Sequence, residues 1–231
     1  MPKLLTLLKN GENKMDNKRI LKTVIFYGGL WGMTEATLGH FLHIFPCGIS
    51  GMIMFPIAFY FMFNSFQKSG KTRAIFYTAL VAASVKLFDL FIPLKTISST
   101  LNPFSAIILE SLIVFGFVKV LRIEKKFVYR KAAVMGILAL TLLTLMQALI
   151  FQPNLGLYKY PLDKLIMYIC LNGLSCGIFI GAYLSKKEQI ERYFEKSYIF
   201  NGLKTIIHKP VFAIIIVCFA IFFEIGNSLW F

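Results

Sequence analysis

The residues of this sequence best able to do chemistry are ionisable and amide side chains that lie within otherwise apolar stretches. A charged group inside a bilayer is costly, so each such residue marks a candidate site of function. Carboxylates, imidazoles, an ammonium group and amides can together surround a small polar or charged solute. The candidate substrate-binding residues are Glu35, His40, His43, Lys86, Asp89, Glu110, Gln147 and Asn172.

Two alternative interpretations concern the same residues. A candidate metal-ligand set, of side-chain types that bind zinc, consists of Glu35, His40, His43 and Cys47. Its spacing is not that of a zinc protease or deaminase. Lys86 and Asp89 are three residues apart on one helix, so they can also form a purely structural ion pair. The sequence has no nucleotide-binding loop and no nucleophile motif, and we expect no resident cofactor.

The elements that must position these side chains are long and apolar. The chain has 231 residues, of which 57% are hydrophobic and only 16% are charged. A helix needs about 20 apolar residues to cross the hydrocarbon core of a bilayer. The sequence therefore predicts an all-α, polytopic transmembrane bundle with spans at about 23–44, 48–66, 74–92, 103–121, 132–152, 165–184 and 210–231.

Basic residues determine the orientation that we expect for this bundle. Cytoplasmic connections retain lysine and arginine, whereas translocated connections contain few. Most of the 25 basic residues precede the first predicted span or follow the second, fourth and sixth. We therefore predict a multi-pass protein of the cell (plasma or inner) membrane with its N-terminus inside and its C-terminus outside. Its predicted parts are a basic cytoplasmic leader at 1–22, a six-helix core at 23–184, a cytoplasmic amphipathic connection at 185–209 and a seventh span at 210–231.

The net charge of +14 raises the question of nucleic-acid binding. The basic residues are spread over one predicted membrane face rather than along one groove-binding element, which excludes nucleic acid as the expected partner. We expect these residues to contact anionic lipid headgroups. The four cysteines have no zinc spacing and are predicted to be packing residues.

The polar residues are distributed unevenly along the depth of the predicted spans. At about 1.5 Å of rise per residue, Glu35 lies near mid-depth and most other candidates lie in the outer half. The inner half is nearly free of polar side chains. This pattern predicts a vestibule that is open to the exterior and closed below, so that a solute would enter it from outside.

Small residues indicate where helices can approach each other closely. The first span has Gly28, Gly32 and Ala36 at intervals of four, and the sixth has Gly173, Gly177 and Gly181. Such stripes allow close backbone contact in lipid. For the sixth span we expect packing within the protein's own bundle. For the first span, packing within the bundle and docking of a partner protein are both open.

With these features, the chain resembles the substrate-capturing S components of energy-coupling factor importers. The resemblance covers about residues 20–185 and depends on chain size, six spans, a cytoplasmic N-terminus and the small-residue stripe of the first span. It implies a membrane subunit that binds a vitamin-like molecule or metal ion from outside. It also implies docking through Gly28, Gly32 and Ala36 onto a transmembrane coupling subunit driven by ATPases. The seventh span departs from this pattern.

Three functional hypotheses follow from the sequence. The first is a membrane-embedded binding subunit for uptake of a small polar or charged solute, energised by partner subunits. The second is an intramembrane metal-dependent enzyme that acts on a lipid-linked substrate through Glu35, His40 and His43. The third is a structural or assembly protein whose ion pairs only hold the bundle together.

Overall fold

Every element of the described chain is helical, as predicted. The computed structural model describes residues 2–42, 49–91, 97–121, 127–151, 161–196, 211 and 214–222. The elements are α1 (Pro2–Thr34), η1 (Glu35–Gly39), α2 (His40–Leu42), α3 (Ile49–Ser69), α4 (Arg73–Leu87), η2 (Phe88–Phe91), α5 (Ile97–Leu121), α6 (Val128–Met146), η4 (Gln147–Phe151) and α7 (Leu162–Lys196). Residues 214–222 are also helical.

Three of these helices are long and apolar enough to cross a membrane. They contain the stretches Thr100–Lys119, Val128–Ile150 and Leu162–Ile190. Many apolar side chains on them are exposed in the isolated chain, which is the distribution that a lipid-facing helix requires. The count of seven spans and the orientation of the N-terminus remain predictions.

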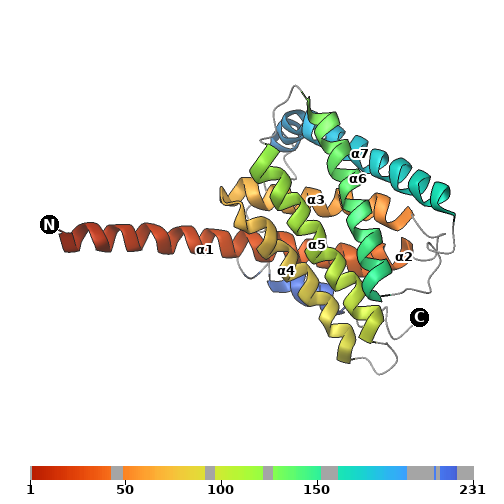
Figure 1. The fold of residues 1–231 in the computed structure, drawn as a ribbon. Coiled ribbons are helices and arrows are strands. Elements are labelled where there is room, and N and C mark those ends of the chain that lie inside the picture. The colour runs from red at the N-terminus through yellow and green to blue at the C-terminus, as the bar shows by residue number, and fades with distance from the viewer. Residues whose placement is uncertain are drawn as a thin grey trace.

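Two helices extend further than the predicted spans. α1 begins at Pro2, so most of the predicted leader at 1–22 continues directly into the first apolar stretch, and Figure 1 shows this part of α1 reaching away from the bundle. α7 has 35 residues and is therefore about 52 Å long. The amphipathic segment that begins near residue 185 is a continuation of α7 as far as Lys196, rather than a separate helix.

Basic residues from several helices gather at one end of the bundle. The Arg73 side chain at the start of α4 donates a hydrogen bond to Asn17 of α1 at 3.0 Å. The ammonium group of Lys68, near the end of α3, lies over the ring of Tyr27 in α1. Lys187 of α7 lies 4.9 Å from the ring centre of Phe63 in α3. These basic residues of α3, α4 and α7 thus lie at the same end of the bundle.

The bundle core combines small and branched aliphatic side chains with several aromatic and sulfur-containing ones. In a membrane these side chains stabilise the bundle by close packing more than by leaving water, because lipid is as apolar as the core. The largest fully buried residues include Trp31, Phe55, Phe59 and Met62.

A buried polar contact joins α3 to α4 within this core. The hydroxyl groups of Ser65 and Thr78 are fully buried and hydrogen-bonded at 2.7 Å. Replacing Thr78 with valine removes the hydrogen-bond partner of the buried Ser65 hydroxyl. We therefore expect the free energy of unfolding to fall by about 1–3 kcal/mol. Thermal unfolding in detergent measures this loss. Ser84→Ala, at an exposed position of α4, should change stability by about 0.5 kcal/mol or less, and an equal loss in both variants would contradict the assignment.

The glycine stripe of α7 packs against α6, which confirms the expectation for the sixth span. A Cβ atom added at Gly173 would lie 2.7 Å from the Cα of Ile137. One added at Gly177 would collide with the backbone of Ala133, and one at Gly181 would meet the ring of Tyr129. Residue numbers rise on one helix as they fall on the other, so α6 and α7 are antiparallel and in direct backbone contact.

The glycine stripe of α1 packs against α4. A Cβ atom at Gly28 would lie 2.6 Å from Cβ of Val81, and one at Gly32 would lie 2.8 Å from a Val85 methyl. Ala36 is buried. Gly28 and Gly32, two of the three predicted partner-docking residues, therefore face the protein's own α4.

The helical segment 214–222 also packs on α1. A Cβ atom at Gly29 would lie 2.8 Å from a methyl group of Val217. This segment, drawn in blue in Figure 1, lies beside α1 and α4. It belongs to the predicted seventh span, most of whose remaining residues lie outside the described part of the chain.

Candidate functional site

Three charged residues from three different elements converge inside the bundle. Gly28 faces Val81 and Gly32 faces Val85, so α1 and α4 run parallel in register. The next turn of the first helix, which contains Glu35, is therefore level with Lys86. Glu110 joins them from α5, which packs against α4. Lys86 is 9% exposed and Glu110 is 8% exposed, so both charged groups are buried.

Glu35 lies within electrostatic range of both Lys86 and Glu110. The charge of Lys86 acts on the carboxyl group of Glu35, and the charge of Glu35 acts on Glu110. Such interactions are much stronger in a low-dielectric interior than in water. The cluster contains one ammonium group and two carboxyl groups. It can therefore accept hydrogen bonds from a polar ligand or balance the positive charge of a cationic ligand.

Both Glu35 and Gln147, two predicted site residues, begin a π-helical turn. These turns are η1 and η4. A π-helical turn inserts one extra residue into a helix and is frequent at functional sites. In η1 the Glu35 side chain extends toward Gly39, where an added Cβ atom would lie 3.2 Å from its Oε1 atom. A glycine at position 39 thus leaves room for the carboxyl group.

Three buried polar atoms have no hydrogen-bond partner among the described residues. They are Trp31 Nε1, Thr100 Oγ1 and Asn102 Oδ1. A buried donor or acceptor without a partner costs about 1–3 kcal/mol, so each of these atoms requires an explanation. Trp31 lies one helical turn before Glu35 and therefore on the same face of the first helix. Sequence reasoning missed it, although its spacing of four from Glu35 was visible.

The remaining predicted site residues are less informative. Gln147 is partly buried, and the amide of Asn172 donates to the Tyr168 carbonyl of its own helix at 2.9 Å. The side chains of His40 and Asp89 lie outside the described part of the chain, as do residues His43 and Cys47 entirely.

Only one residue of the candidate metal-ligand set can be compared with the structure. Of the four candidate ligands, only the side chain of Glu35 is described. Among the described residues, no three His, Cys, Asp or Glu side chains are grouped as metal ligands would be.

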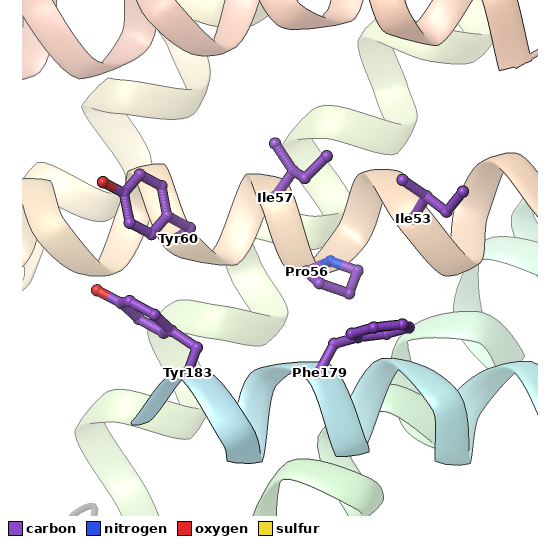
Figure 2. A pocket seen from close by; sticks show the side chains of 6 residues that line it. All are labelled: Ile53, Pro56, Ile57, Tyr60, Phe179 and Tyr183. Atoms are coloured by element: carbon purple, nitrogen blue, oxygen red, sulfur yellow. The ribbon is translucent and has the colours of Figure 1, made fainter. Parts of the chain in front are cut away.

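A separate apolar groove lies between α3 and α7. It has a volume of about 280 Å³ and is lined by Ile53, Pro56, Ile57, Tyr60, Phe179 and Tyr183. Figure 2 labels these side chains and shows Pro56, Phe179 and Tyr183 between the two helices. None of them is a predicted site residue, so this groove is distinct from the charged cluster.

Comparison with known protein families, with curated proteins and with solved structures gave no match for this chain.

Proposed function

We propose that this chain is a multi-pass membrane protein that binds a small polar or charged solute at the cluster of Glu35, Lys86 and Glu110. The proposal is supported by the burial of Lys86 on α4 and Glu110 on α5, with Glu35 of η1 within electrostatic range of both. Charged residues within membrane helices are rare and usually belong to binding sites or ion pathways. The buried indole N–H of Trp31 adds a hydrogen-bond donor near the cluster.

The proposed placement has seven spans, a cytoplasmic N-terminus and an external C-terminus in the cell membrane. The basic end of the bundle supports this orientation, because lysine and arginine are retained on the cytoplasmic side. In that orientation α1 carries Glu35 toward the outer half of the membrane. The solute would therefore enter from outside.

The proposed role is that of a binding subunit for uptake, energised by partner subunits. The sequence contains no nucleotide-binding loop, so energy from ATP would have to come from another chain. The resemblance to S components of energy-coupling factor importers supports this role, with ATPases and a transmembrane coupling subunit as expected partners. Because α4 covers Gly28 and Gly32, docking of such a partner should use another surface.

The proposal predicts that a small polar molecule co-purifies with the full-length chain and is lost when Glu110 is replaced. Glu110→Gln keeps the side-chain shape but weakens hydrogen bonds to the ligand, so we expect about tenfold or greater loss of bound ligand. Native mass spectrometry of protein purified from membranes measures the occupancy. Glu188→Gln, an exposed acidic position on α7, is the matched control and should retain the ligand.

Two results would contradict this proposal. The first is a parent protein that carries no small molecule in any preparation. The second is equal ligand occupancy in the parent, Glu110→Gln and Glu35→Gln. Stoichiometric metal in the purified protein would instead favour the intramembrane enzyme.

A further inference from the structure

Pro56 of α3 lines the groove between α3 and α7. The proline ring faces α7, on the side of Phe179 (Figure 2). Pro56 also has no backbone N–H, so the carbonyl of Met52 loses its usual helical donor. The thiol of Cys176 on α7 lies 3.5 Å from that carbonyl oxygen and supplies a donor from the other helix. The contact between Cys176 and the Met52 carbonyl thus joins the two helices that form the groove.

The groove has one apolar end and one polar, basic end. Ile53, Ile57 and Phe179 form its apolar walls, and Phe179 is 55% exposed. At the other end the rings of Tyr60 and Tyr183 meet edge to face at 5.2 Å, and both hydroxyls point away from the apolar walls (Figure 2). The apolar and polar atoms are therefore ordered along the helix axes.

Basic side chains follow directly beyond the tyrosine end. Tyr183 accepts a hydrogen bond from the amide of Asn64 at 2.8 Å, which fixes the position of its hydroxyl group. Lys187 lies one helical turn further along α7; it is 8% exposed, and its ammonium group lies over the Phe63 ring. Lys68 is exposed near the end of α3, at the same end of the bundle. A ligand in the groove would thus have an apolar part between the helices and a negative part beside these lysines.

We infer that the groove binds one acyl chain of an anionic phospholipid, with the phosphate at the basic end near Lys187. From Ile53 to Tyr60 the groove runs about 10 Å along α3, which suits part of an acyl chain. Its volume of about 280 Å³ is at the lower limit for a site that encloses a small molecule. The positive charge of Lys187 at one end of the groove should favour an anionic lipid over a zwitterionic one. This inference depends on the proposed membrane placement but not on the solute.

Quenching by brominated lipids tests this inference on the full-length chain in vesicles. Phe179→Trp places a fluorophore in the groove, and its signal is measured as the difference from the parent chain. Brominated phosphatidylglycerol in a phosphatidylcholine bilayer should associate with this position about fivefold more than brominated phosphatidylcholine, as expected for one lysine near an anionic group. Ile178→Trp is the matched control, because Ile178 is exposed on α7 but does not line the groove. It should show no preference.

Charge variants in the Phe179→Trp background test the headgroup. Lys187→Gln should abolish the preference for phosphatidylglycerol, and Lys187→Arg should retain it. Lys119→Gln is a matched control, because Lys119 also lies over a phenylalanine ring but on α5. It should leave the preference unchanged.

Equal quenching of Phe179→Trp by the two lipids would overturn the inference, since it would indicate ordinary contact with surrounding lipid. Absence of quenching together with a dimeric mass would also overturn it and assign the groove to a second copy of the chain. Loss of the solute in Glu110→Gln without loss of lipid preference would show that the two sites are independent. If neither tryptophan variant is quenched by any lipid, the membrane placement itself is wrong.

Discussion

Replacing Lys86 with methionine should lower the free energy of unfolding by about 3–5 kcal/mol, because it leaves the carboxyl group of Glu35 without its nearby cation inside the bundle. Lys86 is 9% exposed, and its charge acts on Glu35, which in turn acts on Glu110. Methionine fills a similar volume, so the loss would come from charge rather than from a cavity. Unfolding of the detergent-solubilised protein, followed by circular dichroism, measures the change.

A double variant separates the charge effect from a packing effect. Glu35→Gln combined with Lys86→Met removes one carboxylate together with the lysine and should recover a large part of the lost stability. Lys119→Met, at an exposed position, should change stability by about 0.5 kcal/mol or less. If the double variant is no more stable than Lys86→Met alone, the three groups do not act as an electrostatic unit.

Replacing Gly177 with leucine should lower stability by about 3 kcal/mol or more, and we expect little folded protein. A Cβ atom at this position would collide with the backbone of Ala133 rather than with a side chain that can move away. The two helices would have to separate, and the packing between α6 and α7 would be lost. Yield and melting temperature in detergent measure the effect.

Gly116 of α5 provides the matched control. A Cβ atom there would meet nothing within 4 Å. Gly116→Ala should therefore leave stability unchanged or raise it by up to about 1 kcal/mol, because alanine favours a helix more than glycine does. A Gly177→Leu protein as stable as Gly116→Ala would show that α6 and α7 are further apart than described.

Hydropathy predicted the helices well but their ends poorly. The second span, predicted at 48–66, corresponds to α3 at Ile49–Ser69. The fourth, predicted at 103–121, begins earlier, at Ile97, because a polar first turn precedes Pro103. Window hydropathy detects apolar content, whereas a helix continues wherever backbone hydrogen bonds continue. The same reason explains why α1 and α7 extend beyond the predicted spans.

The residues of the cluster could be listed from the sequence, but their mutual arrangement could not. Counting residues from the span ends placed Glu35 near mid-depth and Glu110 in the outer half. Whether they face each other depends on the rotation of each helix, which is set by contacts such as Gly28 with Val81. The partnerless indole N–H of Trp31 could not be predicted either, because it depends on what surrounds a buried ring.

The groove shows the same limit of sequence reasoning. Pro56 marks α3 as unusual without any knowledge of its neighbours. That α7 lies opposite it, with Cys176 beside the carbonyl of Met52, follows only from the tertiary arrangement. The sequence thus indicates where a helix has a missing donor, and the fold decides which chemical group replaces it.

The contact of α6 with α7 has a mechanical consequence. The backbone of α6 sits against the glycines of α7, which are spaced by about one helical turn. A small sliding movement would bring it against the larger residues between them. Intermediate positions are sterically excluded, so the pair has no continuous path of shear. We therefore expect α6 and α7 to move together as one rigid body, and rearrangement to occur at boundaries filled by side chains.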